Sequence, residues 1–227
     1  MVLAWITCSW VCYKVIKHCG SRVDTLQNQV RQLQQQLNVA YQGTGYAPPV
    51  VHQQAAGGSG KLSEVLFFPD PAMPCHYAGN CRRNNCTYAH QPTNLTRLLQ
   101  FLGSARSTID VCVFTITCDE IAEALLAAQK RGVRVRIISD NDQSKTQGSD
   151  VERLRAAGIP VALDADQYHM HHKFAVLDSR MIANGSFNWT RQAVLFNQEN
   201  VVLSDNPALV AQFCRQFEIL WQKYYKR

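Results

Sequence analysis

Two runs of sequence decide the fold and the chemistry expected of this chain: His171-His172-Lys173-Phe174-Ala175-Val176-Leu177-Asp178 and Gly185-Ser186-Phe187-Asn188. Together they read H-x-K-x4-D-x6-G-S-x-N. The first run has the apolar residues of a buried strand, and residues two apart on a strand point to the same face. We therefore expect His171 and Lys173 to project together and His172 to face the other way. His169 shares the parity of His171, so a second imidazole is expected nearby.

A histidine and a lysine on one face can form a phosphate site. The ammonium holds phosphate oxygens, and the imidazole attacks phosphorus or carries a proton. The small polar run Asn184-Gly185-Ser186 can add backbone and side-chain donors. Asp178 begins the turn predicted at the end of the strand. A lone strand histidine is usually structural, but these residue types at fixed offsets favour a functional site.

This pattern resembles the signature of the phospholipase D superfamily of phosphodiesterases. The resemblance implies a phospholipase D-like α/β/α sandwich and catalysis through a covalent phosphohistidine, with no catalytic metal. It implies that His171 is the nucleophile or the acid, while Lys173 and Asn188 bind the phosphate. By the same resemblance Asp178 is the motif acid that holds the site in shape. Ser186 would donate to the phosphate or the imidazole, and Glu199 would lie beside the phosphate and orient an imidazole.

Superfamily members bring two such motifs together, whereas this sequence has one H-x-K among its seven histidines. The second half of the site must then come from another copy of the chain. We therefore expect a twofold homodimer with the active site on its axis.

A second constellation is formed by Cys75, Cys81, Cys86 and His90, with the spacing C-x5-C-x4-C-x3-H. Three thiolates and one imidazole make the closed tetrahedral shell of a structural Zn²⁺ site. The alternative is a set of free thiols with a chance histidine. The spacing resembles the CCCH zinc finger, which implies stacking of single-stranded RNA on aromatic and arginine side chains such as Tyr77, Tyr88, Arg82 and Arg83.

The zinc insert, the single motif and a short apolar N-terminus together resemble the Zucchini (MitoPLD) family of mitochondrial cardiolipin hydrolases. The resemblance implies the mitochondrial outer membrane, with the catalytic domain facing the cytosol. It implies cleavage of single-stranded RNA in germline piRNA biogenesis as the leading function and hydrolysis of cardiolipin to phosphatidic acid as the alternative. A non-catalytic membrane-tethered scaffold is a third reading, which the intact motif disfavours.

Composition divides the chain into four parts. Residues 1–17 are expected to form an N-terminal membrane-anchor helix or a peripheral amphipathic segment, and residues 18–40 a coiled coil or a lone amphipathic helix. Residues 41–60 read as a flexible linker, and residues 61–227 as the phosphodiesterase domain with its zinc finger at 75–90. The net charge of +6 suits a polyanion or an anionic membrane equally. Nine cysteines without a paired spacing favour a reducing compartment.

Strand and helix patterns alternate along the predicted domain, which indicates a sheet with helices on both faces. Helices are expected at Thr93–Ala105, Asp119–Arg131, Ser149–Ala157 and after Pro207, with Asp119 as the cap of the second. Strands are expected at 64–69, 107–116, 133–138, 159–163, around His171, at 181–182 and at 199–203. Arg134 and Arg136 share a strand face, which favours a solvated edge over an RNA contact.

Overall fold

The computed structural model describes Gln29, Gln32 and residues 62–226. Gln29 and Gln32 are helical and exposed, but the rest of the predicted coiled coil lies outside the described residues. So do the predicted anchor at 1–17 and the predicted linker at 41–60. Among the described helices, none combines the length and the apolar composition that crossing a bilayer needs.

A seven-stranded mixed sheet forms the centre of the domain, in the order β1-β9-β7-β6-β2-β4-β5. The strands β2, β4 and β5 run parallel to one another, and the remaining neighbours are antiparallel. The strands of this sheet are β1 (Ser63–Phe68), β2 (Thr108–Val113), β4 (Arg134–Ser139), β5 (Val161–Leu163), β6 (Lys173–Leu177), β7 (Met181–Gly185) and β9 (Glu199–Ser204).

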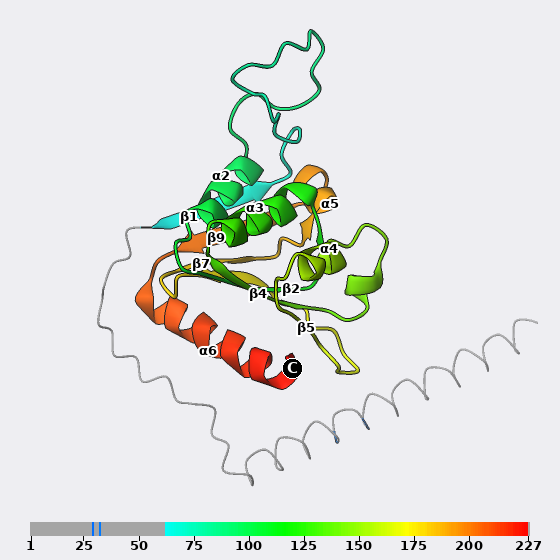
Figure 1. The fold of residues 1–227 in the computed structure, drawn as a ribbon, viewed down its shortest axis with the longest axis vertical. Coiled ribbons are helices and arrows are strands. Elements are labelled where there is room, and N and C mark those ends of the chain that lie inside the picture. Colours follow the sequence, from blue (N-terminus) through cyan, green and yellow to red (C-terminus); the bar gives the residue numbers. More distant parts are fainter. Residues whose placement is uncertain (1–28, 30–31, 33–61, 227) are drawn as a thin grey trace, which may run out of the picture. The chain divides into compact units, whose positions relative to one another are not determined.

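Helices cover both faces of the sheet, as Figure 1 shows. On one face α2 packs on β1 and α3 packs on β4, whereas on the other α6 lies across β4 to β7. The helices are α2 (Asn94–Gly103), α3 (Asp119–Lys130), α4 (Val151–Ala156), α5 (Arg191–Leu195) and α6 (Pro207–Tyr224). The predicted phospholipase D-like α/β/α sandwich is therefore the observed architecture.

Strand β6 shows how the sequence places side chains on the two faces. Phe174 and Val176 belong to the apolar cluster under α6, while Ala175 and Leu177 belong to the larger cluster under α2 and α3. Alternation of this kind follows from the two-residue period of a strand. Lys173 shares the parity of Ala175, which assigns it to the α2/α3 side of the sheet.

The predicted strand 107–116 is wrong in one respect, because it is broken after Val113. Ile116–Thr117 (β3) instead pairs with Trp189–Thr190 (β8) in a separate two-stranded sheet. Neither β8 nor α5 was predicted, because the segment is short and has no clear period.

Two further expectations are corrected. Asp119 is the first residue of α3 and not its cap. Cys118 occupies the N-cap position without a side-chain capping hydrogen bond, and the Asp119 carboxylate accepts from Arg153 at 3.3 Å. Arg136 lies on no solvated edge, because its side chain is only 12% exposed and forms ion pairs with Asp110 and Glu218. These two carboxylates raise the pKa of Arg136 against the opposing effect of its burial. The two ion pairs of Arg136, which lies on β4, connect this strand to β2 and to α6.

Candidate active site

The residues with phosphate chemistry gather where three neighbouring strands of the sheet begin or end. Lys173 opens β6, Gly185 closes β7 and Glu199 opens β9. Because these three neighbouring strands are antiparallel, their alternate ends lie at the same edge. The topology thus brings together side chains that are up to 26 positions apart in sequence.

His171 and Lys173 contact each other directly, as the strand parity predicted. The Lys173 Nζ lies 3.2 Å from His171 Nδ1 and 3.3 Å from Nε2, and it donates to the His171 carbonyl at 3.2 Å. Burial, and then the neighbouring Lys173 and His169, lower the pKa of His171 below its ordinary value. A lowered pKa favours the neutral imidazole, which is the state that a nucleophile requires.

His171 was expected within the strand, but it lies two residues before the start of β6. The sheet pattern nevertheless reaches His172, whose carbonyl accepts from Phe114 N at 2.8 Å. The ring of His172 contacts Phe174, with centroids 5.5 Å apart, on the α6 side. His172 therefore faces away from His171, as predicted.

The Gly185-Ser186 segment packs closely against the start of β9. The Ser186 hydroxyl donates to the Glu199 carboxylate and accepts from Asn200 N at 3.1 Å. A Cβ on Gly185 would lie 1.9 Å from the Asn200 carbonyl oxygen, so only glycine fits this approach. In the single chain, Ser186 and Glu199 thus bind each other, and Asn197 Nδ2 donates to Glu199 at 3.1 Å. Glu199 was expected to orient an imidazole, but within the described residues no imidazole contacts it.

Asn188 follows a buried anchor. The ring of Phe187 stacks on Phe68 with centroids 4.3 Å apart, which fixes the backbone before Asn188. The Asn188 Oδ1 is buried and has no hydrogen-bond partner in the described part of the chain. An unpaired buried amide oxygen costs on the order of 1–3 kcal/mol, so it is an unusual feature of a folded chain. An amide oxygen only accepts hydrogen bonds, so phosphate oxygens would pair with Asn188 Nδ2 and not with this atom.

Three further residues lie at this end of the strands: Asp140, His169 and Phe114. Asp140 and Phe114 were not predicted from the sequence. Asp140 follows β4 and is fully buried, and its Oδ2 lies 3.0 Å from His169 Nδ1. The Phe114 ring contacts both His169 and His171. Asp140, Asp142 and His169 are close enough for a metal, but both Asp140 oxygens already have protein partners. The parity of His169 was the signal that pointed to this group.

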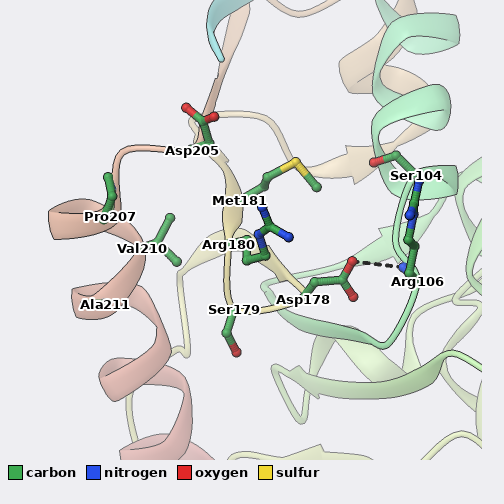
Figure 2. A pocket seen from close by; sticks show the side chains of 10 residues that line it. All are labelled: Ser104, Arg106, Asp178, Ser179, Arg180, Met181, Asp205, Pro207, Val210 and Ala211. Carbon is green, nitrogen blue, oxygen red and sulfur yellow. Dashed lines mark hydrogen bonds between the residues drawn. The ribbon is translucent and has the colours of Figure 1, made fainter. Parts of the chain in front are cut away.

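Asp178, in contrast, lies at the opposite end of β6, in the hairpin to β7 (Figure 2). Seven residues of extended chain span roughly 20 Å, so its carboxylate does not contact His171. It accepts backbone N–H bonds from Arg106 at 2.9 Å, Ser107 at 2.7 Å and Thr108 at 2.8 Å. Burial opposes these donors, but they lower the pKa of Asp178 on balance. Asp178 thus holds the β6–β7 hairpin and does not contact the reacting group, and its predicted role in the site stays a prediction.

A pocket of about 610 Å³ lies at this same distant end. As Figure 2 shows, it is lined by the hairpin, by the chain after α2 and by the start of α6. Asp178 and Asp205 offset Arg106 and Arg180 in its lining. Neither the motif's histidine nor its lysine lines it, so this pocket is not the chemical site.

The four predicted zinc ligands converge. One ligand atom from each of Cys75, Cys81, Cys86 and His90 lies within 4.8 Å of the others. The sulfurs of Cys75 and Cys86 are 3.8 Å apart. A tetrahedron with bonds of about 2.3 Å has edges of about 3.8 Å, so these donors fit a structural zinc ion.

The insert has little else to hold it. Its regular structure is one bridge between Pro74 and Ala89, where two backbone hydrogen bonds join the ends of the insert, and its other backbone hydrogen bonds are local turns. A backbone N–H bond at Tyr88 is the main cause that lowers the pKa of Cys86 to about 7, which favours the thiolate that binds metal. Burial raises the pKa of Cys75. A metal at this cluster would supply the stability that the segment's own packing does not.

Comparisons with known proteins agree with this geometry. Residues 98–221 match the family described as "Cardiolipin synthase, PLD-like domain". The chain is 50% identical to the mitochondrial cardiolipin hydrolase of Chlamydomonas reinhardtii, over 91% of this chain and 92% of that protein. It is 41% identical to the Xenopus tropicalis protein of the same name, over 72% and 78% of the two chains.

Among solved structures, Nuc from Salmonella typhimurium, a phospholipase D family member, superposes with a TM-score of 0.59 and 25% identity. The match covers 71% of this chain and 95% of Nuc. NucT from Helicobacter pylori shares the fold, with a TM-score of 0.56. The same family is indicated by the contact of His171 with Lys173, by the α/β/α sandwich around it and by the similarity to these relatives. We conclude that the chain is a phospholipase D-like hydrolase and belongs to the mitochondrial cardiolipin hydrolase family.

Proposed function

We propose that this chain is a phosphodiesterase that cleaves single-stranded RNA through a phosphohistidine on His171. The observation that carries the proposal is the contact of Lys173 Nζ with both ring nitrogens of His171, which puts a cation and a neutral nucleophile within one phosphate's reach. The partial burial of Lys173 strengthens its electrostatic effect on a bound phosphate.

In the first step an imidazole nitrogen of His171 forms a bond to phosphorus, and the bond from phosphorus to the leaving oxygen breaks. A second imidazole donates the proton that the leaving oxygen takes up. In the second step water attacks phosphorus, the P–N bond breaks, and the second imidazole accepts the proton from water. Lys173 neutralises the phosphate oxygens throughout, and Asn188 is the further phosphate ligand in this proposal.

The second imidazole is His171 of another copy in this proposal. One motif per chain supplies one such group, so a twofold axis beside the sheet edge would complete the site. The exposure of His171 fits a surface that a second subunit covers. A homodimer whose activity falls with dissociation is therefore expected in sedimentation and dilution experiments.

The zinc insert favours RNA as the substrate. Tyr77 is 63% exposed and Tyr88 is also exposed, and with Arg83 both line a small pocket of about 170 Å³. Exposed aromatic rings beside an arginine stack unpaired bases and attract the backbone phosphates. A lipid headgroup has no use for such platforms. Within this proposal the setting is piRNA biogenesis at the cytosolic face of the mitochondrial outer membrane, where the N-terminal segment anchors the chain.

Cardiolipin hydrolysis is the second candidate, because the relatives' names specify that substrate. Cardiolipin is a phosphodiester, so the same His171 and Lys173 would act on it. The net charge of +6 suits its anionic surface as well as it suits RNA.

The two candidates are separated by giving the purified dimer a single-stranded RNA oligonucleotide and cardiolipin vesicles in parallel. His171→Ala serves as the blank for each substrate, and Tyr77→Ala/Tyr88→Ala removes the stacking platforms. We expect His171-dependent RNA cleavage that the double variant weakens by at least about thirtyfold, because each of the two lost base stacks costs about 1–3 kcal/mol. Cleavage of cardiolipin alone would overturn the RNA proposal. Brief chelation should leave the rate unchanged, and a loss that magnesium restores would contradict the phosphohistidine mechanism.

A further inference from the structure

We propose that Phe114 is a positioning residue for the reaction: its ring holds the His171 imidazole beside Lys173, and buried Asp140 holds that ring through His169. This inference rests on the proposed function, since it assumes that His171 is the nucleophile. It adds to the family motif three residues from outside H-x-K-x4-D and G-S-x-N.

The Phe114 backbone is fixed on both sides. Its N–H donates to the His172 carbonyl at 2.8 Å, and its own carbonyl accepts from Ser139 Oγ at 3.3 Å. These bonds attach Phe114 to the residue before β6 on one side and to the last residue of β4 on the other. Phe114 directly follows the end of β2. The strand break, which was not predicted from the sequence, therefore places an aromatic ring beside His171.

The ring touches three groups of the site. Its centroid lies 4.6 Å from that of His171 and 5.3 Å from that of His169, and the Lys173 ammonium lies 5.4 Å from it. The contact with Lys173 is a cation–π interaction, which favours the ammonium over the ring face. One side chain thereby sets the relative positions of the nucleophile and the phosphate-binding cation.

Asp140 fixes His169 and, through it, one side of the ring. The carboxylate is fully buried; Oδ1 accepts from Asp142 N at 3.1 Å and from Gln143 N at 3.0 Å, while Oδ2 bonds His169 Nδ1 at 3.0 Å. The His169 ring meets Phe114 edge to face, at an interplanar angle of 78°. Such contacts are favourable and directional.

His171 needs this support because the fold gives it little else. It is exposed, it precedes its strand, and the torsion about its ring bond is broad in the absence of contacts. Attack on phosphorus requires the reacting nitrogen to stay within a small range of positions, and a misplacement of about 1 Å can cost 10²-fold in rate. A ring that restricts the imidazole therefore acts on kcat more than on substrate binding.

The charged and titratable groups that face His171 are Lys173 on β6, His169 in the loop before it and Asp140 after β4. Burial is the leading cause of the lowered pKa of His171, and Phe114 supplies part of that burial. Removing the ring should therefore let the pKa return upward, while the effects of Lys173, His169 and Asp140 stay in place.

The test measures hydrolysis of bis(4-nitrophenyl) phosphate, a soluble phosphodiester, by the full chain. Phe114→Leu should lower kcat by about 10- to 100-fold with KM within about threefold, and the acidic limb of its kcat/KM profile should move to higher pH. Phe114→Tyr keeps the ring and should keep at least about half of kcat. Phe213→Leu is the matched control, because Phe213 contacts β6 on the opposite face, at 5.0 Å from the Phe174 ring, and it should leave kcat unchanged.

Asp140→Asn and His169→Gln should each lower kcat by about three- to tenfold with an unchanged KM, and they keep the proposal testable if Phe114→Leu does not fold. The positioning role alone would be overturned if Phe114→Leu kept a His171-dependent kcat within twofold of the wild type. An equal loss of kcat in Phe114→Tyr would overturn it as well. A wild-type chain with no activity on this diester, or activity that survives His171→Ala, would overturn the proposed function and this role with it.

Discussion

The two ends of β6 carry two halves of one sequence motif but differ in how their polar groups are satisfied. At the Asp178 end the carboxylate accepts three backbone N–H bonds and the hairpin is closed. At the His171 end the imidazole is exposed, a cation lies against it, and Asn188 has an unpaired buried oxygen. The comparison separates a structural end, which stabilises the fold, from a chemical end, which leaves capacity for a substrate.

The largest effect should come from the chemical end. His171→Ala should lower kcat by at least about 10³-fold, because neither covalent attack nor proton transfer remains. The melting temperature should stay within about 2 °C, since the side chain is exposed and its contacts with Phe114 and Lys173 lie at the surface.

His172→Gln is the neighbouring control, and its side chain faces α6. It should retain most of the activity. Comparable losses in the two variants, in the same steady-state assay, would mean that the two faces of this segment have been assigned wrongly.

Gly185→Ala should affect both stability and rate. The added Cβ would lie 1.9 Å from the Asn200 carbonyl oxygen, so β7 and β9 must separate where Ser186 meets Glu199. We expect a loss of about 1–3 kcal/mol in the free energy of unfolding and about a tenfold fall in kcat. Denaturant titration and steady-state kinetics measure the two.

Gly103→Ala is the matched substitution for Gly185→Ala. A Cβ at Gly103 meets nothing within 4 Å at the end of α2, so this variant should be neutral or slightly more stable. If both alanines behave alike, the close approach of Gly185 to β9 is not a constraint on the site.

The smallest effect on rate should come from the structural end. Asp178→Asn removes the charge that three N–H groups face and should cost about 1–2 kcal/mol of stability, with kcat within about threefold. Asparagine tolerates the positive φ of 54° at this position, so the change isolates the carboxylate.

The pH dependence of that stability has a definite sign. The folded pKa of Asp178 is lowered, so its contribution is complete above the unfolded pKa of about 3.9 and is lost as pH falls through the folded value. The gap between wild type and Asp178→Asn should thus close below about pH 4. A constant gap down to pH 2 would show that the carboxylate's charge is not what stabilises the hairpin.

Local patterns were sufficient for much of this protein. The alternation of the strands and the placement of helices between them predicted the sandwich. The parity of His171, His172 and Lys173 predicted which of them meet. The Cys75, Cys81, Cys86 and His90 spacing predicted a cluster that the fold assembles.

Other features depended on contacts between distant segments. Nothing near Asp178 in sequence indicates that its partners are Arg106, Ser107 and Thr108, about 70 positions away. The same holds for Arg136, whose ion pairs with Asp110 and Glu218 replaced the predicted solvated edge.

The sequence alone therefore determined the residue types, their faces and the chemistry they can perform, because strand parity and ligand spacing are local properties of the chain. The tertiary structure decided which end of each strand is chemical and which is structural, and it brought Phe114 and Asp140 to His171. Those decisions require the strand order β7-β6-β2-β4. That order is set by packing of both sheet faces against helices, and no short window of sequence contains it.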